Sequence, residues 1–134
     1  MGAFCFIDKI SEVEKNRSIT AFFTLKGNEE FLRDHFKNFP VMPGVLILES
    51  LKQAAALLLS GWESSEAQSL RLEEVNEVKF GQFVKPDSLL RIFAQLVKIE
   101  GPRAFLEGRV DLMDDSGHSI GRVLRADFSL VSVL

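Results

Sequence analysis

The chain contains one long apolar run and several stretches in which apolar and polar residues alternate. From Val45 to Leu59 the apolar positions surround a helical axis instead of forming a stripe, which is typical of a buried helix. Pro43-Gly44 suits the start of this helix and Ser60-Gly61 its end. The run is interrupted by Glu49, Lys52 and Gln53. It is therefore too polar in its middle, and too short, to span a membrane.

Most of the remaining chain is predicted to form β-strands. Ala104–Met113 alternates most clearly, with Leu106, Gly108, Val110 and Leu112 on one face. Ser88–Ile99 is mostly apolar, as expected for a strand buried on both faces. The other predicted strands are Arg17–Leu25, Leu70–Phe83 and Ile120–Leu130. Turn residues at Glu100-Gly101-Pro102 and Asp114–Gly117 predict that the last three strands form a meander.

One long helix among about six strands indicates an α+β class in a single domain covering residues 1–134. A chain of 134 residues with 46% hydrophobic and 26% charged residues can bury a core. The polar stretch Glu63–Ser69 is predicted to be a mobile loop. A net charge of −3 gives no reason to expect a nucleic-acid surface.

The single cysteine excludes an internal disulfide framework and fits a reducing compartment. Cys5 lies in the apolar run Phe4–Ile7, so we expect a small core residue. The N-terminus has no pattern typical of a signal peptide. From these features we expect a cytoplasmic protein.

Candidate acid-base chemistry is concentrated in one segment. His35 precedes the turn Pro40-Val41-Met42-Pro43-Gly44, and Glu49 follows 14 residues after His35 on the predicted helix. Histidine is the usual base for removing a proton next to a carbonyl, and a buried carboxylic acid can protonate a leaving hydroxyl. The N–H groups of Gly44 and Val45, at the helix start, can stabilise an enolate-like oxygen.

The other histidine, His118, follows Asp114–Gly117 in a predicted turn, where we expect a solvated residue. Its neighbours have no spacing typical of a metal site, so no metal is expected.

The sequence resembles one enzyme family over most of its length, from about Phe4 to Val131. His35-Phe36, Pro40–Glu49 and Gln53-Ala54 together resemble the signature of FabZ-type (3R)-hydroxyacyl-[acyl carrier protein] dehydratases. Phe6–Ile10 is similar to the opening strand of that family. Val78-Lys79-Phe80 and Val84-Lys85-Pro86 are similar to the strand and turn that follow its helix.

This resemblance implies a hot-dog fold, in which a curved antiparallel sheet wraps around one long helix. It implies active sites at a dimer interface, with His35 as base from one subunit and Glu49 as acid from the other. Gly44 would be an oxyanion donor and Gln53 would position Glu49. The family further implies acyl carrier protein as partner, a dimer or a trimer of dimers, and no dissociable cofactor.

Several positions depart from the family pattern. Asp34 and Lys37 flank His35-Phe36 where the family often has Gly and usually has Pro, and Lys52 stands where a small apolar residue is usual. Two alternatives therefore stay open. One is an acyl-CoA hydratase or thioesterase of the same fold. The other is a non-catalytic acyl-binding subunit of a synthase complex, in which Lys52 holds Glu49 ionised.

Overall fold

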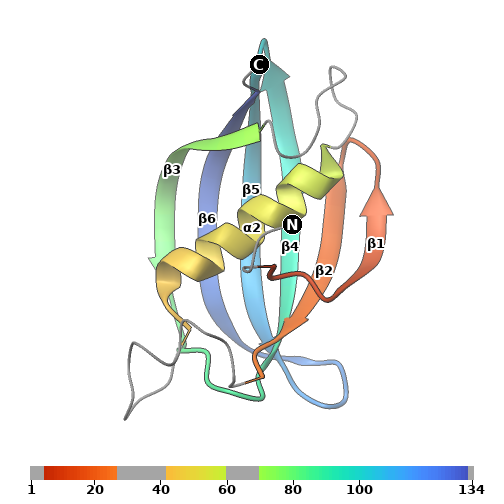
Figure 1. Cartoon of the computed structure of the whole chain (residues 1–134), viewed down its shortest axis with the longest axis vertical. Helices are drawn as coiled ribbons and strands as arrows, with labels where there is room; N and C mark the ends of the chain where they lie inside the picture. Colours follow the sequence, from red (N-terminus) through yellow and green to blue (C-terminus); the bar gives the residue numbers. More distant parts are fainter. Residues whose placement is uncertain (1–4, 27–41, 60–69, 133–134) are drawn as a thin grey trace.

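The computed structural model describes residues 5–26, 42–59 and 70–132, and these residues form one curved antiparallel sheet that partly encloses one helix (Figure 1). The helix, α2, spans Gly44–Leu58. The six strands, in the order in which they lie in the sheet, are β1 (Lys9–Glu14), β2 (Ser18–Thr24), β4 (Leu89–Glu100), β5 (Arg103–Met113), β6 (Ser119–Ser132) and β3 (Leu70–Phe80). This is the α+β, hot-dog arrangement expected from the sequence.

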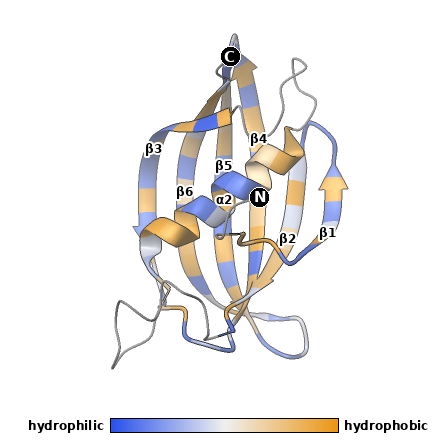
Figure 2. Ribbon diagram, viewed as in Figure 1, coloured by the Kyte–Doolittle hydropathy of each residue, from blue (hydrophilic) through white to orange (hydrophobic). Residues whose placement is uncertain are grey.

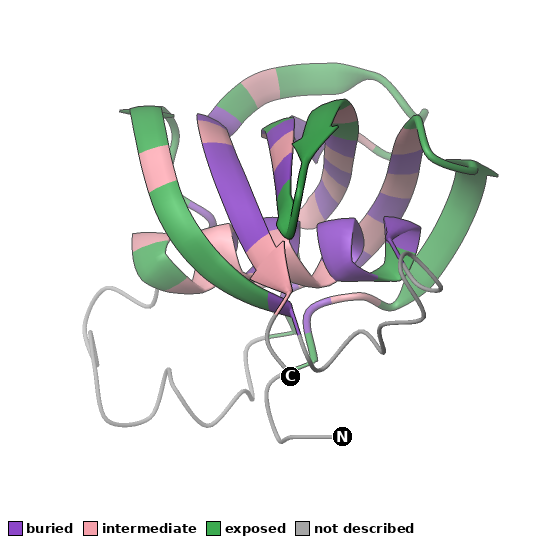
Figure 3. Ribbon diagram, turned by 90° about the horizontal axis from the view of Figure 1, so that it is seen from above, coloured by how far each residue is buried: buried purple, intermediate pink, exposed green. Residues whose placement is uncertain are grey.

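The meander predicted for the last three strands is confirmed. β4 pairs with β5 and β5 with β6, and each pair is antiparallel. One more strand pairs with each outer strand of this meander: β2 with β4, and β3 with β6. Strands β1 and β3 are therefore the two edges, and Figure 3 shows both as largely exposed.

The core lies between the sheet and α2. Alternate residues of each inner strand face the helix, as predicted for β5, where Leu106 and Val110 are buried. Gly108 is required at this interface, because a Cβ there would lie 2.7 Å from Leu51 Cδ2 of α2. Its missing side chain lets the helix approach the centre of the sheet, which seats the middle of α2 against the strands.

Three sequence predictions are wrong in detail. β4 was predicted to be buried on both faces, but only its helix-facing residues are buried. Its outer face carries partly exposed residues such as Arg91 and Phe93. β1 begins at Lys9, so Phe6–Asp8 precede the strand instead of opening it. Cys5 is exposed, whereas the neighbouring Phe6 is 1% exposed. Phe6 is the buried residue of the segment from Cys5 to Asp8.

The predicted loop Glu63–Ser69 lies outside the described residues. No described helix is both long and apolar enough to cross a bilayer.

A charged pair adds to the backbone pairing that holds the edge strand β3 in the sheet. Glu73 occupies a bulge in β3 and accepts hydrogen bonds from Arg103 Nε at 2.8 and 3.0 Å, across the intervening strand β6. Ser129 of β6 also donates to Glu73, at 3.4 Å. The hydrogen bonds from the Arg103 guanidinium hold the pKa of Glu73 below its ordinary value, although both side chains are partly exposed.

Candidate active site

The candidate site lies on the surface of α2 that faces away from the sheet. Val45, Glu49, Gln53 and Leu57 are four residues apart and form one stripe along the helix, which we call the outer stripe. Figure 2 shows its hydrophilic centre between hydrophobic ends. Val45 is 70% exposed and Leu57 is 41% exposed, whereas Glu49 and Gln53 are partly buried.

The exposure of this stripe corrects the expectation of a fully buried helix. One curved sheet covers one side of a helix, so the apolar residues on the opposite side remain open within a single chain (Figure 3). Apolar residues at both ends of an exposed stripe are typical of a surface covered by another protein or a ligand.

Glu49 is held in place by its neighbour one turn later. Gln53 Nε2 donates a hydrogen bond to Glu49 Oε2 at 3.1 Å. Gln53 in turn accepts a hydrogen bond through Oε1 from the backbone N–H of Phe6, at 2.8 Å. The expected contact between Gln53 and Glu49 is therefore present. The link to Phe6 had no signal in the sequence, because it joins residues 47 positions apart.

The start of α2 offers donors for a negatively charged oxygen. Pro43 is the N-cap, and it provides no side-chain hydrogen bond to the first turn. The first N–H groups of a helix have no acceptor within it, and here they include those of Gly44 and Val45. The first turn contains no acidic residue that would compete for the positive end of the helix dipole.

Phe80, which the sequence analysis did not include among the site residues, lies against this helix start. A Cβ on Gly44 would be 2.6 Å from Phe80 Cε1. The Phe80 ring is 62% exposed, so it forms an apolar border beside Gly44 and Val45 instead of a core contact. The alternation of residues along β3 predicts only on which face of the sheet Phe80 lies. Its meeting with Gly44 depends on β3 lying at the edge of the sheet, where the end of the strand reaches the helix.

The distance between the helix start and Glu49 suits a small substrate unit. Five residues of α-helix span about 7.5 Å along the axis, and helical side chains tilt toward the N-terminus. Glu49 thus lies between one and two turns after Gly44 on the same helix. An acid and an oxyanion donor can in this way act on neighbouring atoms of one acyl group.

His35 lies outside the described residues, as do Asp34 and Lys37. Its role as base, and its distance from Glu49, stay predictions. Lys52 is described, and among the described ion pairs none joins it to Glu49. The contact that motivated a non-catalytic subunit is therefore not seen in this part of the chain.

A hollow of about 290 Å³ lies elsewhere, lined by residues of β3, β4, β5 and β6 that include Val97, Phe105 and Glu107. No residue of α2 lines it, and it has neither the acid nor the helix start. In the residues that the structure describes, no cluster of His, Cys, Asp and Glu could hold a metal ion. The outer stripe, which has both the candidate acid and the helix start, is therefore a better candidate for the active site than this hollow.

A curved sheet around one helix defines a hot-dog-fold protein, and Glu49, held by Gln53, is its candidate acid. Comparison with known proteins gives the family. The model of the FabA-like domain matches residues 1–118. The chain belongs to this FabA-like family, in the branch of the FabZ-type dehydratases.

Two curated relatives show the extent of the similarity. The 3-hydroxyacyl-[acyl-carrier-protein] dehydratase FabZ of Pediococcus pentosaceus is 41% identical over 93 residues, which are 69% of this chain and 62% of the relative. The match thus spans less than two thirds of that relative. The FabZ of Oceanobacillus iheyensis is 34% identical over 99 residues, which are 74% of this chain and 71% of the relative.

Solved structures agree on the fold. The dehydratase heterocomplex ApeI:P from Xenorhabdus doucetiae superposes with a TM-score of 0.67 at 19% identity, covering 90% of this chain and 92% of that chain. A Streptococcus mutans protein, solved bound to acetyl CoA, gives a TM-score of 0.66 at 14% identity, covering 93% and 87%. At these identities the likeness establishes the hot-dog fold alone.

Proposed function

We propose that this protein removes water from (3R)-hydroxyacyl chains carried on acyl carrier protein, giving trans-2-enoyl thioesters in fatty acid or related acyl-chain biosynthesis. One observation carries the proposal: Glu49 is held by Gln53 on the outer stripe, beside the uncapped start of α2. Membership of the FabA-like family supports it independently.

In the proposed mechanism His35 takes a proton from C2 of the thioester. The negative charge that develops on the thioester oxygen is stabilised by the N–H groups of Gly44 and Val45. The bond from C3 to the hydroxyl then breaks as Glu49 transfers a proton to that oxygen, and water leaves. His35 ends protonated and Glu49 ionised, so one proton passes from His35 to Glu49, through solvent, before the next turnover. We propose no metal or dissociable cofactor, because the thioester already acidifies C2.

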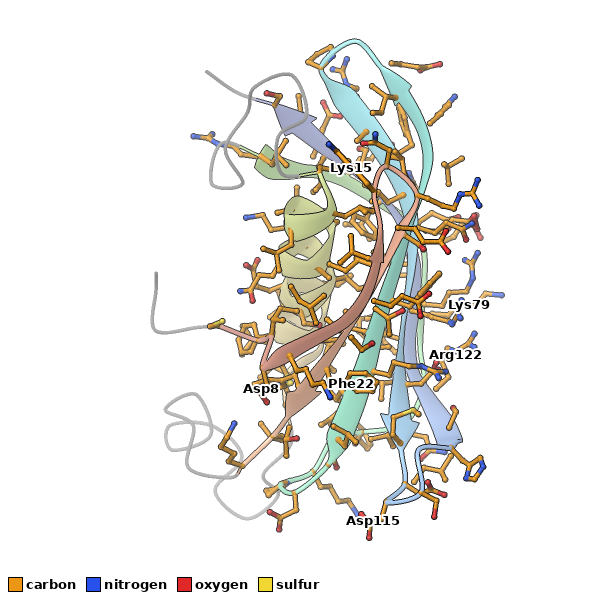
Figure 4. The ribbon with its side chains drawn as sticks, turned by 90° about the vertical axis from the view of Figure 1, so that its right-hand side faces the viewer. Asp8, Lys15, Phe22, Lys79, Asp115 and Arg122 are labelled. Atoms are coloured by element: carbon orange, nitrogen blue, oxygen red, sulfur yellow. The ribbon has the colours of Figure 1, made fainter. Side chains whose placement is uncertain are left out.

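An acidic carrier protein requires a local cationic surface on this chain, whose net charge is −3. The outer face of the sheet, opposite α2, carries one. Arg91, Arg109 and Arg122 surround the buried carboxylate of Asp111, at 3.3, 3.7 and 3.0 Å. Beside them, Lys79 and Arg125 are cross-strand neighbours. Figure 4 shows Lys79 and Arg122 pointing away from the helix. This face lies on the side of the sheet away from the outer stripe, and Arg125 on it is paired with Glu107 and Asp127, so we propose the carrier as partner without assigning its contact to this face.

We further propose that the protein acts as a homodimer or trimer of dimers in the cytoplasm. The exposed apolar ends of the outer stripe support a covering subunit, which would contribute its own His35 to the site of Glu49. The single cysteine fits a reducing compartment.

The deciding assay follows the enoyl product from 3-hydroxybutyryl and longer thioesters, on carrier and on CoA. The purified protein should form enoyl thioester, and faster from carrier than from CoA. His35→Ala should stay folded by circular dichroism and lose at least ~100-fold in turnover, the usual scale of general-base catalysis. An absence of turnover at every chain length would contradict the proposal, and thioester hydrolysis without enoyl product would indicate a thioesterase. Full activity of His35→Ala would remove His35 as the base.

A further inference from the structure

The Gln53 side chain lies between two partners of different chemistry. On one side the backbone N–H of Phe6 donates to Oε1 at 2.8 Å, and on the other Nε2 donates to Glu49 Oε2 at 3.1 Å. The segment that carries Phe6 comes from the N-terminal part of the chain and runs beside α2 (Figure 1). The candidate acid is thus connected, through the Gln53 amide, to the segment that precedes β1, although Gln53 and Phe6 are 47 positions apart in the sequence.

The first of these partners decides how the amide is oriented. A glutamine side chain can exchange the places of its oxygen and nitrogen by rotating half a turn, and the neighbours determine which is favoured. A backbone N–H can only donate, so the atom that faces Phe6 must be the oxygen. Since the amide is planar, its NH₂ group then faces Glu49.

The Phe6 N–H is itself a fixed reference point. The Phe6 ring is 1% exposed and meets the Phe23 ring edge-on, with centroids 5.6 Å apart. Two residues later, the Asp8 N–H donates to the Phe22 carbonyl at 2.8 Å. The Asp8 carboxylate accepts from the Thr24 N–H at 2.8 Å. Packing and these hydrogen bonds therefore hold the segment that carries Phe6 against β2.

An oriented NH₂ group determines where the acid carries its proton. Glu49 Oε2 accepts from Gln53, and a proton on Oε2 would meet the hydrogens of that NH₂ group. The proton of the neutral acid therefore belongs on Oε1. We propose that the backbone N–H of Phe6 is a positioning group of the active site, which fixes Gln53 so that Glu49 presents a protonated Oε1 to the substrate.

This inference rests on the proposed function, in which Glu49 is the acid. In the step concerned, the O–H bond at Oε1 breaks and the proton moves to the C3 hydroxyl oxygen. The C3–O bond breaks at the same time and Glu49 is left as a carboxylate. A Gln53 amide rotated by half a turn would present its oxygen to Glu49, which would draw the proton onto Oε2 and away from the substrate.

The test compares Phe6→Pro with Phe6→Ala. Both remove the buried ring, and only proline also removes the N–H, so Phe6→Ala is the matched control. Phe6→Pro should have a kcat about tenfold below that of Phe6→Ala, the scale of one lost hydrogen bond, with KM within about twofold. A kcat of Phe6→Pro within about twofold of Phe6→Ala would overturn the proposal.

A spectroscopic measurement on the intact protein needs neither variant to fold. In protein labelled with ¹³C and ¹⁵N the side-chain NH₂ signals of Gln53 should move as Glu49 is protonated, with Glu49 followed through its own carboxyl ¹³C signal. The movement should be absent in Glu49→Gln. Gln53 signals that do not change when Glu49 is protonated would overturn the proposal. If the wild-type protein forms no enoyl product, the proposed function fails, while these signals still decide the orientation of Gln53.

Discussion

At the scale of single residues, the candidate chemistry depends on one carboxylate in an apolar helix. Glu49 is partly buried, and a buried carboxylate needs a hydrogen-bonding partner. Gln53 supplies that partner. A neutral amide orients an acid without fixing its charge, whereas a lysine in the same place would hold it ionised. The identity of the contacting residue therefore separates an acid that can donate a proton from a carboxylate that only binds.

Lys52→Ala tests this distinction directly. Because no described ion pair joins Lys52 to Glu49, we expect kcat and KM to change by less than about twofold. The measurement is the rate of enoyl formation beside wild-type protein. A large rise in turnover would mean that Lys52 suppresses the acid, and would revive the hypothesis of a binding subunit. Lys98→Ala is a control for the loss of a lysine, since Lys98 lies in the exposed last part of β4 and its ion pair is with Glu100.

At the scale of elements, the path of the chain after β3 places Phe80 against the helix start. Immediately after β3, the Gly81 N–H donates to the Val123 carbonyl at 2.8 Å, and the Gln82 N–H donates to Arg122 at the same distance. A Cβ on Gly81 would overlap the Arg122 carbonyl oxygen, which belongs to the backbone. The close approach of this segment to β6 therefore requires glycine at position 81.

Gly81→Ala should destabilise the protein by about 1–3 kcal/mol, because backbone atoms of β6 must move to accept the new methyl group. Gly121→Ala is the comparison, since a Cβ there meets only the exposed and flexible Gln82 side chain, at 2.6 Å. We expect it to cost less than about 0.5 kcal/mol. Urea unfolding of both variants measures the difference. Equal stabilities would show that the segment after β3 does not lie against β6 as described.

At the scale of the whole molecule, the exposed outer stripe is the surface that the proposed second subunit would cover. Val45 and Leu57 are open at its two ends, and the proposed base belongs to a second subunit. The monomer mass is 15.0 kDa, so a dimer or hexamer is readily distinguished by analytical ultracentrifugation. Mass alone does not show that the site is shared, which requires a functional measurement.

Mixing two inactive variants provides that measurement. In a heterodimer of His35→Ala and Glu49→Gln, one of the two shared sites has both substitutions and the other has neither. After the subunits are exchanged, activity should return to about a quarter of the wild-type value, because half of the dimers are mixed and each has one intact site. A mixture as inactive as its components, after exchange has been verified by mass, would place both residues in one subunit.

The sequence alone determined the class of fold, because its signals are local. Alternation in Ala104–Met113, the turn residues after it and the apolar run of α2 that follows Pro43 each depend on neighbours within a few positions. Motif spacing also indicated Glu49, Gln53 and the helix start, which lie on one element. The prediction that Cys5 is buried was wrong, because only packing decides which of two adjacent apolar residues faces the core.

Only the tertiary structure decided what joins residues far apart in the sequence. The ring of Phe80 on Gly44 depends on β3 pairing with β6 at the sheet edge, and the Phe6–Gln53 hydrogen bond depends on where the leading segment meets α2. The exposure of the outer stripe likewise follows from one sheet covering one side of a helix. Such contacts arise from the packing of whole elements against one another, so no local pattern encodes them.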